Sequence, residues 1–286
     1  MSASSASLIR RPVPRLINQA LPHVILSAYT LFALFPIILI VINSFKVREA
    51  IFSVPYQPPL PGTFDPVGYQ TVFSRASFQQ YFVNSFIVTT ASLFLILWAG
   101  SMAAYALSEY QFSGNRWLGL YLSIGIMIPI RLGTVSILRI MVGLGLVNTL
   151  VALILVYIAQ GLPLAIFILT QFMRQVPREL KEAARIDGAS EYRIYWLILP
   201  LVRPALGAIG VFTMIPIWND LWFPLILAPG DATATVTLGA QQFLGQFVSD
   251  WNAVLASLTL AMVPILILYV LFSRQLIRGI TAGAVK

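Results

Sequence analysis

The sequence is poor in the residues on which many enzymes and metalloproteins depend. It has no cysteine and a single histidine, His23. Disulfide bonds and thiolate catalysis are therefore excluded, and one histidine cannot supply the ligand set of a zinc site. Charged residues make up only 10% of the chain, against about 25% in a soluble domain. A membrane-embedded enzyme built on clustered histidine or carboxylate side chains is disfavoured on these grounds.

Lysine is also scarce, which excludes one common energy source. The lysines are Lys46, Lys181 and Lys286. None of them lies in the Gly-x-x-x-x-Gly-Lys-Ser/Thr context of a Walker A motif, so the chain cannot hydrolyse ATP through a phosphate-binding loop of its own. We expect no catalytic residue, no metal and no cofactor. Energy for any transport has to come from a partner protein or from an ion gradient.

Apolar residues, by contrast, are abundant and gathered in long runs. They make up 58% of the 286 residues, and the mean hydropathy is +0.85. A helix crosses about 30 Å of hydrocarbon with about 20 residues, and a backbone in lipid has to satisfy its own hydrogen bonds. The chain is therefore predicted to be an all-α membrane protein with six transmembrane helices, at about 22–43, 81–107, 117–138, 149–173, 204–228 and 253–273.

The basic residues lie at the ends of these runs and predict the orientation of the chain. The net charge is +8, but the cations form no continuous stripe, so a nucleic-acid partner is not expected. Thirteen lysines and arginines fall on the side that holds both termini, and five fall on the other side. The positive-inside rule then places both termini in the cytoplasm. We expect a cytoplasmic segment at 1–21, a transmembrane domain at 22–276 and a cytoplasmic tail at 277–286.

The most informative segment is the polar loop 174–203, between the fourth and fifth apolar runs. Nine of the charged residues lie within 177–204. Residues 178–187 are predicted to form one short helix and residues at about 190–198 a second one, and Gly188 between them can adopt a positive φ. A connection of about 30 residues with two helices is longer than topology alone requires, which indicates a surface that a partner binds.

This loop resembles the EAA loop of importer permeases of the ATP-binding cassette (ABC) class. Glu182-Ala183-Ala184 is followed at the family's spacing by Gly188 and Ile198. Leu199-Pro200 then follow directly, so one residue is missing from the family's Ile-x-Leu-Pro. The resemblance implies that the loop is a cytoplasmic coupling loop that docks on an ATPase. The residues it assigns to coupling are Glu182, Ala183, Ala184, Asp187 and Gly188.

The resemblance extends from about residue 22 to the C-terminus and is closest to the second membrane subunit of carbohydrate importers of the maltose-transport type. The residues that carry it are Tyr81 to Ser85, Gly145 to Thr149, Trp218-Asn219-Asp220 and Arg278 to Lys286. It implies a multi-pass permease in the bacterial inner membrane, powered by ATP hydrolysis elsewhere. The implied partners are a second homologous permease, two ATPase subunits, an extracytoplasmic solute-binding protein and membrane lipid.

Charged residues inside the predicted spans indicate a translocation path. Arg131 lies about 21 Å along the third span and Asp220 about 24 Å along the fifth, counted from the cytoplasmic ends. A structural ion pair between these two is an equally good interpretation. Asn219 and Asp220 lie between Trp218 and Trp222, and an aromatic, amide and carboxylate cluster suits a sugar-type substrate. The candidate path residues are Arg131, Trp218, Asn219, Asp220 and Trp222.

The main alternative is an ion-coupled secondary transporter of a small polar solute. Such a transporter typically shows a buried acidic relay and internal repeats, whereas Asp220 is the only acidic residue within a predicted span. The sequence leaves the substrate open among mono-, di- and oligosaccharides, polyols and glycerol phosphates.

Overall fold

The computed structural model describes residues 15–75, 77–244 and 250–284, and the regular structure in these ranges is helical apart from isolated bridge residues, among them the pair Lys46 and Phe64. The predicted segment 1–21 and tail 277–286 lie partly outside these ranges. The helices are α1 (Arg15–Asn43), α2 (Arg48–Ser53), α3 (Val67–Arg75), α4 (Phe78–Glu109), α5 (Asn115–Met127), the 3-10 turn η1 (Ile130–Gly133), α6 (Thr134–Gly143), α7 (Leu150–Arg174), α8 (Arg178–Ile186), α9 (Glu191–Ile198), α10 (Arg203–Trp218), α11 (Trp222–Leu227), α12 (Val236–Gln241) and α13 (Trp251–Ala284).

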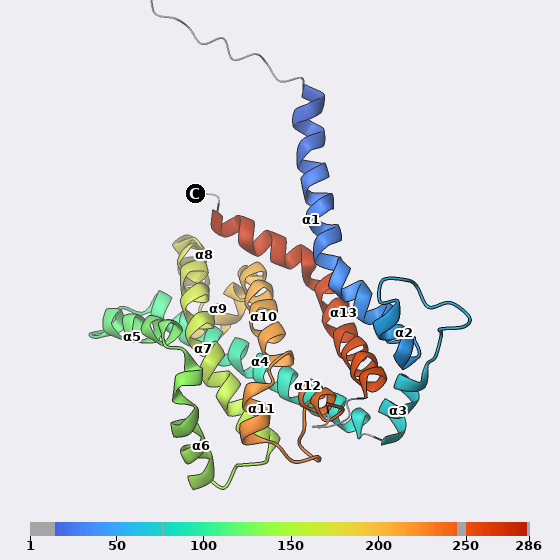
Figure 1. The fold of residues 1–286 in the computed structure, drawn as a ribbon. Coiled ribbons are helices and arrows are strands. Elements are labelled where there is room, and N and C mark those ends of the chain that lie inside the picture. Colours follow the sequence, from blue (N-terminus) through green and yellow to red (C-terminus); the bar gives the residue numbers. More distant parts are fainter. Residues whose placement is uncertain (1–14, 76, 245–249, 285–286) are drawn as a thin grey trace, which may run out of the picture.

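The helices are arranged so that the two ends of the molecule differ. In Figure 1, the start of α1, the end of α13 and the short helices α8 and α9 lie at one end, while α3, α12 and the far end of α6 lie at the other. In the described part of the chain, three helices are long and apolar enough to cross a membrane, or up to five if each bent helix pair counts as one span. The first, second and fourth predicted spans correspond to α1, α4 and α7.

Two of the predicted spans are wrong as single continuous helices. The third, 117–138, is split between α5 and the η1–α6 segment, and the two parts are bent by 86°. Pro129 explains the break, because a proline disfavours helical backbone at the residue before it, and Ile128 is extended. The fifth, 204–228, is divided between α10 and α11. Among the described helices the apolar part of α13, Trp251–Ile267, is shorter than a full span.

The centre of the molecule is the close packing of α4 against α7. Small residues allow it: an added Cβ at Gly100 would lie 3.0 Å from the Ala165 Cβ. Ile96 fills the space beside Gly161 in the same interface. Membrane helices associate through such close backbone approach, because lipid supplies no hydrophobic drive between them. The largest buried cluster extends from this pair onto α9 and α10.

The N-terminal ends of α4 and α7 are tied to the loop that follows α11. Asn84 Nδ2 donates to the carbonyls of Ala232 and Ala234, both at 2.9 Å, and Ser85 Oγ accepts from the Val236 amide at 2.8 Å. Thr149 caps α7, and Asn148 is the residue before it. Asn148 Oδ1 accepts a hydrogen bond from the Gly230 amide at 2.8 Å. The motifs 81–85 and 145–149 therefore have a structural role in holding this loop.

A second set of contacts closes the segment between α1 and α4. Lys46 is fully buried, and its Nζ donates to Asn43 Oδ1 and to the Val54 carbonyl, both at 2.9 Å. Burial lowers the pKa of Lys46 below its usual value. The Lys46 carbonyl accepts from Asn252 Nδ2 at 2.6 Å, which connects this segment to the start of α13.

The contact between α3 and α13 gives a test of the fold. A Cβ added at Gly68 would lie 2.3 Å from the Asn252 carbonyl oxygen, whereas one at Gly62 would meet nothing within 4 Å. Gly68→Ala should therefore overpack the interface and lower stability by about 1–3 kcal/mol, and Gly62→Ala should not. Thermal unfolding of the purified chain in detergent measures both, and equal unfolding midpoints would contradict this packing.

Candidate functional site

The polar loop folds into the two short helices predicted from the sequence. α8 begins after Pro177, which fits the first turn of a helix, and α9 begins after Ser190. Gly188 between them has φ +74°, a conformation that favours glycine. The two helices are therefore separate elements joined by a sharp, fixed turn.

The outer face of α8 is free of contacts with the rest of the chain. Glu182, Ala183, Asp187 and Gly188 are exposed, and Ile186 has 86% of its surface exposed. Ala184 is half-buried and packs on the central cluster. Four of the five predicted coupling residues thus lie on the accessible surface, and the fifth supports the helix from below.

The inner face of α8 is held by an ionic cluster around Glu109, the last residue of α4. Lys181 Nζ and Arg185 Nη2 each donate to a different Glu109 carboxylate oxygen at 2.7 Å. Arg185 Nε also donates to Glu191 Oε1 at 2.9 Å, and Tyr105 OH donates to Glu191 Oε2 at 2.9 Å. The hydrogen bonds with Glu191 and Glu109 raise the pKa of Arg185 above its usual value.

Glu109 was missed in reasoning from sequence, although a signal for it exists. Lys181 and Arg185 are spaced i, i+4 and share one face of α8. Lys181 is buried and Arg185 is partly exposed, and a buried cation needs an acid opposite it. Glu109 lies just after the second apolar run and is the acid nearest to the C-terminal end of that run.

A second polar cluster lies where the two broken helices meet. Arg131, in η1, donates from Nη2 to Asp220 Oδ1 at 3.3 Å. The same carboxylate accepts from Tyr157 OH at 2.9 Å and from the backbone amides of Trp222 and Phe223 at 3.3 and 3.1 Å. Asp220 therefore has four donors and orients the first turn of α11.

The members of this cluster differ greatly in exposure. The Arg131 side chain is 66% exposed, whereas that of Asp220 is only 7% exposed. Asn219 is exposed, and Trp222 is partly exposed and donates from its indole to Thr134 Oγ1 at 3.0 Å. Arg131, Asn219 and Trp222 thus border open space, and Asp220 lies behind them.

Trp218 is separated from the open side of this cluster. It is buried, packs edge-on against Phe82 and donates from its indole to the Ala261 carbonyl at 3.1 Å.

Tyr157 was also missed in reasoning from sequence, because a tyrosine in an apolar run gives no sign of which carboxylate it contacts. In the described residues, no three histidine, cysteine or acidic side chains are placed to hold a metal ion.

Comparison with known proteins identifies the class to which this architecture belongs. Residues 96–282 match the model of the family described as "Binding-protein-dependent transport system inner membrane component". The chain is 38% identical over 269 residues to a putative ABC transporter permease protein, ORF2, of Caldicellulosiruptor sp. (strain Rt8B.4), covering 92% of this chain and 95% of that protein. It is 30% identical over 270 residues to the diacetylchitobiose uptake system permease protein NgcG of Streptomyces coelicolor, covering 93% and 89%.

A third relative and a solved structure agree with this assignment. The arabinooligosaccharides transport system permease protein AraQ of Halalkalibacterium halodurans is 33% identical over 261 residues, covering 89% of this chain and 91% of that one. The fold matches, with a TM-score of 0.77 and 22% identity, a chain from the crystal structure of a bacterial ABC transporter involved in import of alginate, covering 94% and 99%. The resemblance read from the sequence is confirmed: the chain belongs to the family of multi-pass inner-membrane permease components of binding-protein-dependent ABC transport systems, and it is a transport component rather than an enzyme.

Proposed function

We propose that this chain is one half of the membrane pathway of an importer for a sugar or oligosaccharide. In this proposal it pairs with a second, homologous permease and binds two ATPase subunits, and an extracytoplasmic binding protein delivers the substrate. The substrate class is supported by relatives named for uptake of diacetylchitobiose and arabinooligosaccharides. The observation that carries the proposal is α8, a helix with a free outer face and an inner face clamped to the end of α4.

The proposed topology has six membrane crossings with both termini in the cytoplasm. The broken third and fifth segments and the terminal helix α13 are counted as crossings, besides α1, α4 and α7. The thirteen-to-five distribution of basic residues supports this orientation. So does the placement of α8 at the same end as the start of α1 and the end of α13 (Figure 1).

Coupling is proposed to run from the ATPase through α8 into α4. Glu182, Ala183, Ala184, Asp187 and Gly188 form the docking surface, on which small side chains allow close approach. Movement of α8 pulls on Glu109 through two charge-assisted hydrogen bonds, which are stronger than neutral ones. Because α4 packs tightly on α7, the displacement reaches both helices of the central pair.

The path is proposed to pass the junction of the broken helices. Discontinuous helices next to polar side chains are the usual construction of a substrate site in transporters. Arg131, Asn219 and Trp222 border open space and are proposed to contact a hydroxylated substrate. Asp220 is proposed to hold Arg131 in position, and Trp218 to support the end of α10 from the buried side.

Reversing a charge on the docking surface tests the coupling role. Glu182→Lys and Gly188→Pro should leave the chain inserted but reduce binding of the ATPase subunits and substrate-stimulated ATP hydrolysis at least about tenfold, the effect of about 1.4 kcal/mol. The matched control is Glu49→Lys, which reverses the charge of an exposed residue in α2. In the proposed topology this residue lies on the other side of the membrane from α8. Full stimulated hydrolysis in both loop variants would exclude docking at α8.

The clamp between α8 and α4 is tested by removing its acid. Glu109→Gln leaves Lys181 charged and buried, which should cost about 3–5 kcal/mol of stability and slow stimulated ATP hydrolysis. Adding Lys181→Met should restore the unfolding midpoint but not the coupling, since the mechanical connection stays broken. Glu179→Gln, an exposed acid on the same helix, serves as control. Unchanged coupling in the double variant would refute transmission through this cluster.

The path role of Arg131 is separable from its role in the ion pair. Arg131→Gln keeps a donor facing Asp220 and should leave folding intact while lowering uptake of labelled sugar at least about tenfold, the effect of about 1.4 kcal/mol. Arg139→Gln, an exposed arginine on α6, should have no effect. The double variant Arg131→Leu and Asp220→Leu removes both charges; near-normal uptake in it would show a structural pair and eliminate the substrate role.

A further inference from the structure

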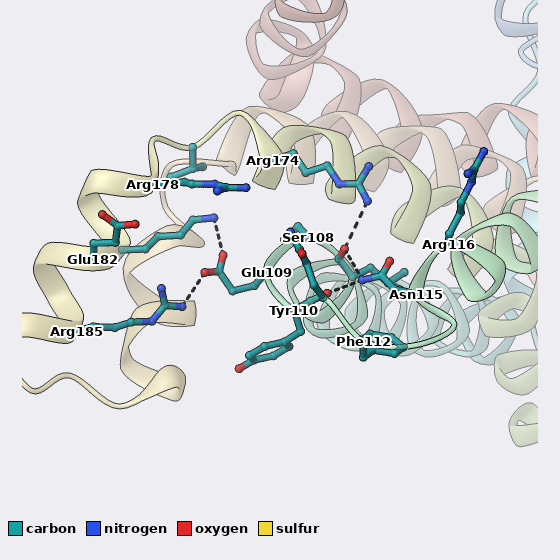
Figure 2. A pocket seen from close by; sticks show the side chains of 14 residues that line it. Ser108, Glu109, Tyr110, Phe112, Asn115, Arg116, Arg174, Arg178, Glu182 and Arg185 are labelled. Carbon is teal, nitrogen blue, oxygen red and sulfur yellow. Dashed lines mark hydrogen bonds and ion pairs between the residues drawn. The ribbon is translucent and has the colours of Figure 1, made fainter.

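A cavity of about 930 Å³ lies between α8 and the turn that connects α4 to α5. Five basic and two acidic side chains line it, and they come from four helices. Figure 2 shows arginines from α5, α7 and α8 around the end of α4, which holds Ser108, and the turn after it, which holds Tyr110. The basic residues are Arg116, Arg174, Arg178, Lys181 and Arg185, and the acidic ones are Glu109 and Glu182.

The charges in this cavity are not balanced within the chain. Glu109 is already shared by Lys181 and Arg185. Among the described residues, Arg116, Arg174 and Arg178 have no acidic side chain within ion-pair distance. Arg174 reaches only the Leu107 carbonyl, at 3.5 Å. Three guanidinium groups that line one cavity without a carboxylate partner can bind an anion there.

The cavity continues into a groove along α5. A second cavity of about 180 Å³ shares Leu107, Asn115, Arg116 and Arg174 with the first. It continues between α5 and α7, past Gly119, Leu122, Ser123, Ile166, Phe167 and Thr170. A third cavity, of about 190 Å³, starts again at Leu122 and reaches Ile128 and Pro163. From Arg116 to Ile128 the groove follows α5 for about 18 Å.

We infer that this continuous surface is a binding site for one anionic phospholipid of the cytoplasmic leaflet. The phosphate would lie among Arg116, Arg174 and Arg178, and an acyl chain would lie in the groove between α5 and α7. Basic pockets between helices at the cytoplasmic surface recognise anionic headgroups in this way. Exposed Trp117, Tyr110 and Phe112 beside the cavity match the aromatic belt at headgroup depth. A soluble anion would use the arginines but would gain nothing from the groove.

The site adjoins the clamp that holds α8. Lys181 and Arg185 both line the cavity, and Lys181 Nζ and Arg185 Nη2 donate to Glu109. A bound phosphate adds negative charge beside these cations and strengthens the position of α8. The inference depends on the membrane orientation of the chain and not on which sugar is carried, so it can fail while the proposed function stands.

The test measures lipid retention by native mass spectrometry on the full chain purified with its partner subunits. The delipidated complex is incubated with phosphatidylglycerol or phosphatidylethanolamine of identical acyl chains. We expect preferential retention of phosphatidylglycerol, and a loss of about fivefold in its affinity for each arginine removed in Arg116→Gln and Arg174→Gln. Arg139→Gln, outside the cavity, should change nothing.

A second variant tests the groove without altering charge. An added Cβ at Gly119 would meet nothing within 4 Å, so Gly119→Leu should fold normally and fill the groove. It should reduce phosphatidylglycerol retention as strongly as loss of an arginine. Equal retention of both lipids, an unchanged result for Gly119→Leu, or displacement of phosphatidylglycerol by millimolar inorganic phosphate would overturn the inference. Retention only when the ATPase subunits are absent would also overturn it, since the cavity would then be an ATPase contact.

Discussion

The close packing of α4 against α7 is the constraint on which the rest of the structure depends. Both candidate sites take one essential group from this pair: Glu109 ends α4, and Tyr157 lies within α7. The loop after α11 is held by Asn84 and Ser85 on α4 and by Asn148 next to α7. Side chains with small volume at this interface, Gly100 and Ala165 among them, bring the two backbones together. If this pair separated, the ionic clamp and the polar junction would lose their geometry together.

The two polar clusters solve the problem of a buried carboxylate in different ways. Glu109 is balanced by two cations, and both of its oxygens are used within one helix–helix contact. Asp220 has one largely exposed arginine, and its other three donors are neutral groups that fix the local backbone. A carboxylate that is fully hydrogen-bonded tolerates burial far better than an isolated one. The first arrangement suits a permanent connection, and the second leaves Arg131 largely exposed, as its proposed role in the path requires.

The sequence was sufficient to predict the helical class and the two helices of the polar loop, because these depend on local patterns. Apolar runs marked α1, α4 and α7, and Pro177 and Gly188 marked the ends of α8. The 86° bend was not predicted, because the angle depends on packing around Pro129. The partners of Lys181 and Asp220 are distant in sequence, so Glu109 and Tyr157 required three-dimensional information. The same holds for Trp218, whose burial against Phe82 cannot be read from its neighbours.

The contacts at the two ends of α4 have a mechanical consequence. Asn84 holds the loop after α11, and Glu109 holds α8. These two residues are separated by about 38 Å along α4. If α4 tilts as a rigid body about its midpoint, its two ends move in opposite directions. A tilt of about 5° displaces each end by about 2 Å over this length. A movement of α8 toward the centre of the transporter would therefore move the loop after α11 away from that centre, and α4 would keep its length.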